Sequence, residues 1–268
     1  MPCIMIQGTM SGAGKSTLVT ALCRILSDMK YDVVPFKSQN MSSFTHDKLK
    51  ISRAQATQAQ AARCEVTPEI NPILLVPYNE TSSEVFEMGR SRGTMDTWTY
   101  YKYAENEGIR AAATALSNLR QNHDVVILEG AGSPAEINIP FDMANMMMAK
   151  MADASVIITA DIERGGCFAQ MVGTISLLPR EHSQRVEGFV INKFRGDASI
   201  LYTGIQHVRR VTNIDTIGVI PYTDVQLPPE DSLDYHNTTI PTEQAIASIS
   251  DIIKENINVQ HILDCISS

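Results

Sequence analysis

Glycine, lysine and hydroxyl side chains are concentrated near the start of the chain, in the stretch GTMSGAGKST from Gly8 to Thr17. Glycines let the backbone turn tightly and point several N–H groups at one anion, and the lysine of such a loop reaches the β- and γ-phosphates of a nucleotide. A hydroxyl directly after that lysine completes the coordination shell of Mg²⁺. The stretch therefore predicts a phosphate-binding loop for ATP and Mg²⁺. The residues expected to hold the nucleotide here are Gly8, Thr9, Gly12, Ala13, Gly14, Lys15, Ser16 and Thr17.

The glycine spacing of this loop departs from the usual pattern. That pattern leaves four residues between the first glycine and the Gly-Lys pair, whereas five residues separate Gly8 from Gly14. The apolar run CIMIQ precedes the loop and a helical pattern follows it, which is the context that phosphate binding needs. A glycine-rich turn whose lysine is merely exposed is the alternative, but it leaves this order of strand, loop and helix unexplained.

A carboxylate stands at the end of another apolar run, in VVILEGAGSP, where Glu129 precedes two glycines. Glycines beside a strand end let a ligand approach the backbone. A carboxylate there is positioned to hold Mg²⁺ or its water. We therefore predict that Glu129 and Ser16 are the metal ligands; a solvated glutamate at a strand end is the alternative.

Short apolar runs alternate with longer segments of helical period along the chain. This alternation predicts an α/β fold, a mostly parallel, doubly wound sheet with helices on both faces. The expected strands are Cys3–Gln7, Asp32–Phe36, Val125–Glu129, Ser155–Asp161, Val186–Asn192 and Thr216–Ile220. The expected helices are Lys15–Met29, Ile51–Arg63, Thr97–Leu119, Phe141–Met151, Phe168–Leu177 and Ala198–Arg210.

Two segments stand outside the alternation, although we expect residues 1–268 to form a single domain. Residues 67–93 contain three prolines, which exclude a long helix, and include SSEVFEMG, which favours a short extra strand. We interpret this segment as an excursion from the sheet edge. Residues 242–264 repeat isoleucine at helical spacing and predict a terminal helix that docks on the sheet.

The charge balance of the chain argues against nucleic-acid binding. Lys and Arg number 22 against 30 Asp and Glu, which gives a net charge of −8, and the sequence contains no basic run. Five dispersed cysteines without a Cys-x-x-Cys pair predict reduced thiols in a cytoplasmic protein. No uninterrupted apolar stretch is long enough to span a membrane.

The loop of the form GT-x-x-x-x-GK-[ST] resembles that of dethiobiotin synthetase and its relatives, P-loop enzymes that activate carboxylates. Further motifs, in the same order along roughly residues 3 to 233, resemble the synthetase domain of the cobyric acid synthase family. They are PFKSQNMSS, SRAQATQAQAA, NPILLVP, LEGAGSPAEIN, ADIERGG, GFVINKFRGD, GVIPY and LPPEDSL. The resemblance implies ATP-dependent amidation of carboxylates on a corrinoid substrate, cobyrinic acid a,c-diamide, through acyl phosphates.

The resemblance also implies roles for residues outside the phosphate loop. Besides Lys15 and Glu129, it implies catalytic roles for Lys37, as a second lysine on the phosphates, and for Asp161. Asn192, Lys193 and Pro221 are expected around the nucleotide base. The expected substrate-binding residues are Gln39, Asn40, Arg53, Asn138 and Arg164.

Three features depart from the family pattern. No cysteine lies in a Gly-x-Cys-x-Gly setting typical of the family's glutaminase, so we expect ammonia from a separate glutaminase subunit or from free ammonium. Val76 stands where the family commonly has lysine. The second magnesium-ligating aspartate of some relatives is unassigned, since only Asp47 or Gln55 lies in that region. We expect a natural stand-alone synthetase subunit that forms a homodimer, although a fragment of a longer enzyme is the alternative.

Two other functions remain open at this point. A dethiobiotin synthetase-like carboxylase would share the loop and the fold, but QNMSS, ERGG and INKFRGD speak against it. A regulatory P-loop ATPase of the partitioning type would carry an additional lysine early in the loop. Residues Thr9 to Ala13 contain no lysine.

Overall fold

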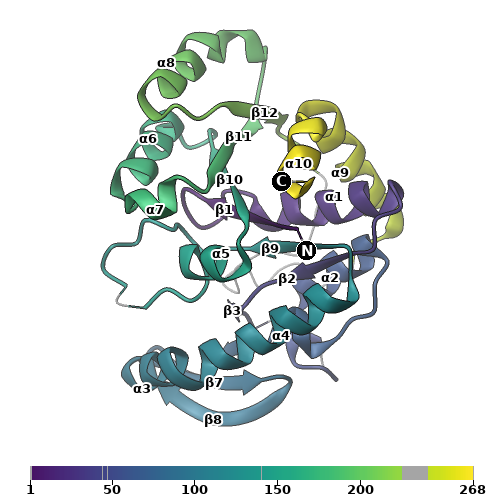
Figure 1. Ribbon diagram of the computed structural model, residues 1–268, viewed down its shortest axis with the longest axis vertical. Helices are drawn as coiled ribbons and strands as arrows, with labels where there is room; N and C mark the ends of the chain where they lie inside the picture. Colours follow the sequence, from purple (N-terminus) through teal and green to yellow (C-terminus); the bar gives the residue numbers. More distant parts are fainter. Residues whose placement is uncertain (1, 44, 47, 140, 225–240, 268) are drawn as a thin grey trace.

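A parallel sheet forms the centre of the molecule in the computed structural model, which describes residues 2–43, 45–46, 48–139, 141–224 and 241–267 (Figure 1). Within these residues the sheet has six strands in the order β12-β11-β10-β1-β9-β2. Every neighbouring pair in this sheet is parallel. The strands are β1 (Cys3–Gly8), β2 (Val33–Phe36), β9 (Val125–Glu129), β10 (Ser155–Asp161), β11 (Val186–Phe194) and β12 (Thr216–Pro221). All six strands expected from the sequence are present; β9 and β10 have the expected bounds and the others differ by at most two residues at an end.

Successive residues of the strands contribute to the cores on the two faces of the sheet. In β1, Ile4 and Ile6 pack in one core, whereas Cys3 and Met5 pack in the other. Side chains alternate between faces along a strand, so a strand covered on both sides is apolar throughout. This explains why the strands were readable as continuous apolar runs.

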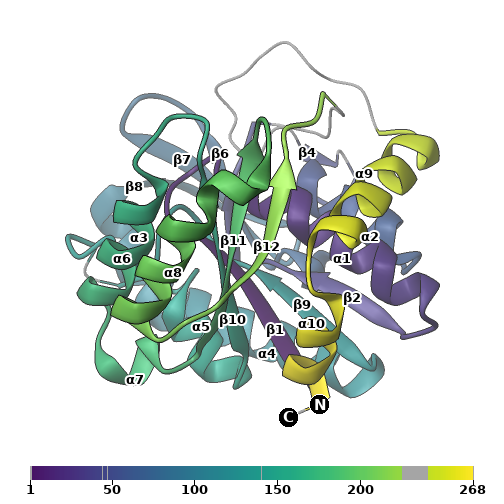
Figure 2. The ribbon, with the colours of Figure 1, turned by 90° about the horizontal axis from the view of Figure 1, so that it is seen from above.

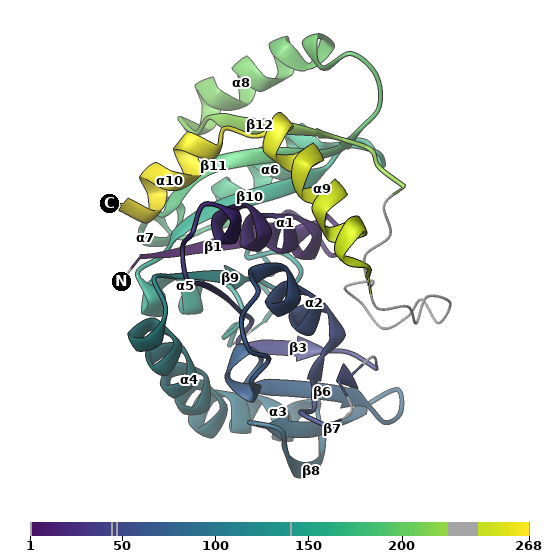
Figure 3. The same cartoon turned by 90° about the vertical axis from the view of Figure 1, so that its right-hand side faces the viewer.

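Helices cover both faces of the sheet, as Figures 2 and 3 show. One face carries α1 (Lys15–Asp28), α2 (Arg53–Ala62), α9 (Glu243–Asn256) and α10 (Val259–Ser267). The other carries α4 (Ile109–Asn122), α5 (Met146–Ala152), α6 (Cys167–Leu177), α7 (Arg180–Ser183) and α8 (Tyr202–Thr212). No helix in the described part of the chain is both long and apolar enough to cross a membrane.

A smaller sheet lies beyond β2, at one edge of the central sheet (Figure 3). It has the order β3-β6-β7-β8, with β3 parallel to β6 and the other pairs antiparallel. Its strands are β3 (Gln39–Met41), β6 (Ile73–Pro77), β7 (Ser82–Glu87) and β8 (Arg90–Asp96). The segment 67–93 thus forms a 3-10 turn (Pro68–Ile70), β6, β7 and most of β8, and Asp96 then caps α3 (Thr97–Tyr103).

Several helices begin later than their periodicity indicates. The helix expected from Ile51 begins at Arg53, because Ile51–Ser52 form the short strand β5 with β4 (Thr45–His46) and the Ser52 hydroxyl caps the helix. The one expected from Phe141 begins at Met146, since Asn145 has non-helical backbone angles. The helix expected from Ala198 starts as a 3-10 turn (Ala198–Leu201) before α8.

The helices expected over Thr97–Leu119 and over 242–264 are both interrupted. A π-helical turn (Ala104–Gly108) joins α3 to α4. The terminal segment is two helices, α9 and α10, because Ile257 adopts an extended conformation and forms a β-bridge with Gly218 of β12. Asn258 then accepts a hydrogen bond from the backbone N–H of His261 at 3.1 Å, so its side chain caps α10.

Candidate functional site

The loop between β1 and α1 turns through two glycines in the left-handed region. Gly12 and Gly14 have φ values of 71° and 100°, in the region that favours glycine. A Cβ atom on Gly14 would lie 1.9 Å from Nδ2 of Asn192. That amide donates to the Ala13 carbonyl at 3.0 Å, so the end of β11 holds the loop from one side.

Lys15 opens α1 and is fully buried beside this loop. Its Nζ donates to the carbonyl oxygens of Met10 and Gly132, both at 3.4 Å. These bonds are long, and a phosphate group is a much stronger acceptor for an ammonium. The ammonium therefore lies between the loop and the segment after β9, where it is able to pair with an incoming phosphate.

Glu129, the last residue of β9, is the centre of a buried polar cluster. Its Oε1 accepts from the Ser16 hydroxyl at 2.9 Å and pairs with Nζ of Lys37 at 2.6 Å. Its Oε2 accepts from the side-chain amides of Gln58 and, at 3.4 Å, Gln55. Lys37 is thus an internal ion-pair partner of the carboxylate, and not an exposed lysine at a strand end.

The donor set around Glu129 fits Mg²⁺. Mg²⁺ prefers oxygen ligands and uses one or two protein groups together with phosphates and waters. Ser16 and Glu129 present a hydroxyl and a carboxylate oxygen 2.9 Å apart, next to the phosphate loop. The described residues contain no cluster of three or more His, Cys, Asp or Glu side chains with metal-binding geometry.

A second ion pair lies on the other side of the loop. Asp161, at the end of β10, accepts from Nζ of Lys193 at 2.7 Å, and the same Nζ donates to the Gly12 carbonyl at 2.8 Å. Asn192 and Lys193 therefore both contact the phosphate loop itself. Pro221 lies exposed at the end of the neighbouring strand β12.

The loops after β10, β11 and β12 are joined by a contact that the sequence did not reveal. The Arg195 guanidinium stacks on the Tyr222 ring, 3.3 Å from its centroid, and pairs with Glu163 at 3.1 Å. Glu163 is held by its backbone N–H, which donates to Asp161 Oδ1 at 2.8 Å. Arg164, the expected substrate ligand, is the exposed neighbour of Glu163.

The remaining substrate candidates lie on separate segments. Asn40 is buried in β3 and donates to Gln55 at 2.8 Å, so it is linked to the Glu129 cluster, and Gln39 precedes it on the same strand. Arg53 is the first residue of α2 and is half-buried. Asn138 is exposed in the segment between β9 and α5.

Buried amides organise the site, and most of them were missed in the sequence. Asn145 accepts from the Ala131 N–H at 3.0 Å and donates to the Ala131 carbonyl at 2.8 Å, which fixes the segment after Glu129. Gln55 and Gln58, three residues apart, face Glu129 from α2. Their spacing of three residues is visible in the sequence and places both glutamines on one face of the helix.

The cysteines are poor nucleophiles. Burial raises the pKa of the Cys64 thiol to about 12 and that of Cys265 to about 11. Cys167, at the start of α6, also has a raised pKa because of burial. Thiolate is the reactive form, so these values suppress nucleophilic chemistry at neutral pH.

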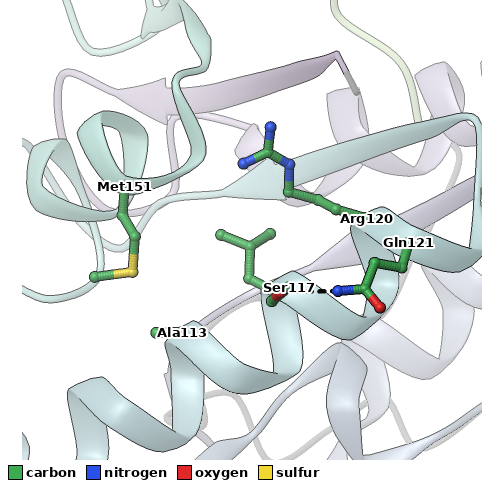
Figure 4. Close-up of a pocket in the computed structure, with 6 residues that line it drawn as sticks. Ala113, Ser117, Arg120, Gln121 and Met151 are labelled. Carbon is green, nitrogen blue, oxygen red and sulfur yellow. Dashed lines mark hydrogen bonds between the residues drawn. The ribbon is translucent and has the colours of Figure 1, made fainter.

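A separate hollow lies between α4 and α5 (Figure 4). Ser117 accepts from the Gln121 side chain there at 3.4 Å, and Met151 faces them from α5. Its position near the end of α4 places it toward the amino end of β9, whereas Glu129 lies at the carboxyl end. None of the expected site residues lines this pocket.

The parallel sheet, the phosphate loop and the strand-end carboxylate define an α/β P-loop nucleotide-binding protein. The family of the CobQ/CobB/MinD/ParA nucleotide binding domain matches residues 4–232, and the chain belongs to this family. The MinD cell division protein of Aquifex aeolicus shares the fold, with a TM-score of 0.52 and 14% identity over 95% of this chain and 96% of that one.

Curated relatives of this chain include cobyric acid synthases, as the motifs indicated. The chain is 50% identical over 234 residues to the probable cobyric acid synthase of Thermococcus kodakarensis. It is 48% identical over 238 residues to the cobyric acid synthase of Lachnoclostridium phytofermentans. Each alignment covers 86% of this chain but only 48% and 46% of the relative. The chain therefore spans about half the length of the curated relatives it matches, and the resemblance to their nucleotide-binding part is confirmed.

Proposed function

We propose that this chain is an ATP-dependent amide ligase that converts side-chain carboxylates of cobyrinic acid a,c-diamide to amides and so forms cobyric acid. Its relatives carry the name cobyric acid synthase. The observation that carries the mechanism is the Glu129 cluster, in which Ser16 and Lys37 both contact one carboxylate oxygen beside the phosphate loop. This arrangement supports a carboxylate-activating enzyme of the dethiobiotin synthetase type.

The proposed chemistry begins with phosphoryl transfer. A carboxylate resists attack by ammonia because its leaving group would be oxide. One substrate carboxylate oxygen attacks the γ-phosphorus of ATP and ADP leaves, giving an acyl phosphate. Ammonia then attacks the acyl carbon, loses one proton to solvent, and phosphate departs, which leaves the amide. Such transfer depends mainly on positioning and charge neutralisation.

The residues of the loop region have distinct roles in this proposal. Lys15 neutralises the transferring phosphoryl group, and Lys37 both pairs with Glu129 and adds a second positive charge nearby. Ser16 and Glu129 would hold Mg²⁺, which would supply further positive charge for phosphoryl transfer. Asp161 acts through Lys193 on the loop backbone, and Asn192, Lys193 and Pro221 surround the base.

The substrate side is assigned to residues near the carboxyl ends of the strands. Asn40 and Gln39 would bind a substrate carboxylate or amide with their side-chain amides. Arg53 and Arg164 offer guanidinium groups, which bind carboxylates bidentately. Asn138 is proposed as a further polar contact. The ammonia would come from a separate glutaminase subunit or from free ammonium, and the protein would act as a cytoplasmic homodimer.

Mass spectrometry of the corrinoid tests this function. Cobyrinic acid a,c-diamide is incubated with the protein, ATP, Mg²⁺ and ammonium, and each amidation exchanges a hydroxyl for an amino group. We expect a ladder of such mass shifts that requires ATP. Addition of carbon dioxide to a diamine substrate, with no change in the corrinoid, would favour the carboxylase alternative. ATP turnover that depends on self-association and not on corrinoid would favour a regulatory P-loop ATPase.

A further inference from the structure

Five polar side chains form a continuous buried chain from β3 to the metal side of the phosphate loop. They are at most 4% exposed, and they are Lys37, Asn40, Gln55, Gln58 and Glu129. Burying amides and charges is unfavourable unless every group is paired, and an apolar core would fill the same space at lower cost. The proposed chemistry uses Lys37 and Glu129 directly but leaves the glutamines without a role.

The two oxygens of Glu129 have different partners. Oε1 faces Ser16 and Lys37, on the side of the nucleotide loop. Oε2 faces the amides of Gln58 and Gln55, on the side of α2. The glutamines therefore fix the rotation of the carboxylate and leave Oε1 for the phosphate side.

An ionised carboxylate accepts hydrogen bonds and donates none, and this fixes the orientation of each amide in turn. Gln55 must present its NH₂ group to Glu129, so its Oε1 points the other way and accepts from Nδ2 of Asn40 at 2.8 Å. The same NH₂ group lies 3.5 Å from Oε1 of Gln58. The charge on Glu129 thus determines how Asn40, on β3, is oriented.

The backbone around this chain is fixed by another buried amide. Asn71 accepts from the N–H of Ser52, the cap of α2, at 3.1 Å and donates to the carbonyl of Lys37 at 3.1 Å. Asn71 therefore links the start of α2 to the end of β2.

We propose that Gln58 and Gln55 are positioning residues for Glu129, and that Gln55 couples Asn40 to the Mg²⁺–nucleotide site. A ligand group that binds Asn40, of the carboxylate or amide class, would favour the carboxylate orientation that receives Mg²⁺, and by linkage Mg²⁺–nucleotide would favour binding at Asn40. This inference rests on the proposed function for the placement of nucleotide and metal beside Glu129. The coupling keeps nucleotide binding and substrate binding in step.

Nucleotide binding without any corrinoid tests the positioning role. The affinity for a fluorescent ATP analogue is measured with Mg²⁺ and with EDTA in the wild type, in Gln58→Met and in Gln60→Met, a control on the same helix. The near-isosteric Gln58→Met removes the shorter of the two hydrogen bonds to Oε2. We expect it to weaken Mg²⁺-dependent binding about tenfold, while binding in EDTA stays within about twofold. Gln60→Met, whose amide contacts Glu243 instead, should match the wild type in both.

A double-mutant cycle of Asn40→Leu and Gln55→Met tests the coupling. Asn40→Leu alone should weaken Mg²⁺-dependent binding about threefold, and it should have no further effect when Gln55 is already methionine. Effects that simply multiply would overturn the coupling. A Gln58→Met variant that keeps wild-type Mg²⁺ dependence and is folded by circular dichroism would overturn the positioning role.

A second comparison separates failure of this inference from failure of the proposed function. Lys15→Met should abolish binding of the analogue in every condition. If Lys15→Met abolishes binding while Gln58→Met binds as the wild type and the effects of Asn40→Leu and Gln55→Met multiply, the nucleotide site is supported and the coupling is wrong. If Lys15→Met binds normally, the nucleotide site itself is misplaced.

Discussion

Glu129 illustrates how the site depends on individual side chains. The same carboxylate oxygen contacts a hydroxyl from the phosphate loop and an ammonium from the end of β2, although these residues are far apart in the chain. Removing one partner of a buried ion pair leaves the other charge uncompensated, which is strongly destabilising. A loss of activity after substitution of Glu129 or Lys37 alone could therefore come from unfolding. Substitutions of neighbouring residues test the nucleotide site more directly.

Gly14 is one such residue. Gly14→Ala introduces a Cβ at a φ of 100° and 1.9 Å from Nδ2 of Asn192, so the backbone is strained and either the loop or the Asn192 side chain must shift. Backbone strain of this kind costs about 1–3 kcal/mol, and we expect nucleotide affinity to fall about tenfold or more by calorimetry. Gly12→Ala, which has positive φ but open space, should have a smaller effect.

Gly173→Ala is the matched control for both loop variants. Gly173 lies inside α6, where an added Cβ would have no atom within 4 Å, and its φ is not positive. Alanine is about 0.5–1 kcal/mol better than glycine in a helix, so this variant should bind nucleotide normally and melt slightly higher. Normal nucleotide affinity in Gly14→Ala would contradict the assignment of the loop.

The residues of the phosphate loop were predictable from the sequence, whereas the roles of most buried amides were not. A phosphate cradle needs glycines, a lysine and a hydroxyl within one short segment, so its pattern is local. The role of Gln58 arises only because α2 packs its amide against Glu129, which lies on a strand much later in the chain. Asn145 likewise acts on Ala131, across a loop whose path no local pattern specifies.

Helices α1 and α2, which carry residues of the candidate site, both contact α9 through the carboxylate of Glu243. Glu243 in the first turn of α9 pairs with Arg24 of α1 and accepts from Gln60 of α2 at 3.2 Å. An acidic side chain in the first turn also interacts favourably with the helix dipole. The first turn of α9 therefore contacts both α1 and α2 through this one side chain.

Replacement of this carboxylate should give a pH-dependent loss of stability. The hydrogen bond from Arg24 lowers the pKa of Glu243, so its contribution is present above the pKa of an unfolded glutamate, about 4.3, and is lost as the pH falls through the lower folded value. Because the side chain is 63% exposed, we expect Glu243→Gln to cost only about 0.5–1 kcal/mol at pH 7 in urea unfolding. The two proteins should converge in acid, and a difference that grows in acid would contradict the assignment.

The strands were predicted from the sequence more accurately than the helix ends. A strand buried on both faces is apolar throughout, and this is visible without knowledge of its neighbours. The breaks in the helices depend on distant contacts, as in the bridge between Ile257 and Gly218 that separates α9 from α10. A Cβ on Gly218 would lie 2.7 Å from Ile257, so the glycine permits this approach.

Of the whole fold, the smaller sheet is the part that the sequence indicated least. Only one of its strands, within SSEVFEMG, was expected. Of the others, β3 is short, β6 is a five-residue run that follows Pro72 and ends at Pro77, and β8 is a polar edge strand without an apolar pattern. Its position beyond β2 brings Asn40 to the Glu129 cluster. The second sheet thus contributes a side chain to the hydrogen bonds around Glu129.

The proposed function requires a source of ammonia. No cysteine here lies in the Gly-x-Cys-x-Gly setting of the family's glutaminase. With ATP, Mg²⁺ and corrinoid, we expect amide formation with ammonium and none with glutamine alone, as measured by mass spectrometry of the corrinoid. Addition of a separate glutaminase should restore use of glutamine. Turnover of glutamine by the purified chain would refute this expectation.

Phosphorylation of a substrate carboxylate by ATP is the step on which the proposed function depends, and the fate of the carboxylate oxygen reports on it. The corrinoid is labelled with ¹⁸O in its free carboxylates and incubated with the protein, ATP, Mg²⁺ and ammonium, and the phosphate released is analysed by mass spectrometry. We predict that each amide formed transfers one labelled oxygen to inorganic phosphate, and that Lys15→Ala yields none while remaining folded. Amide formation with unlabelled phosphate, or with the label in AMP, would contradict activation through an acyl phosphate.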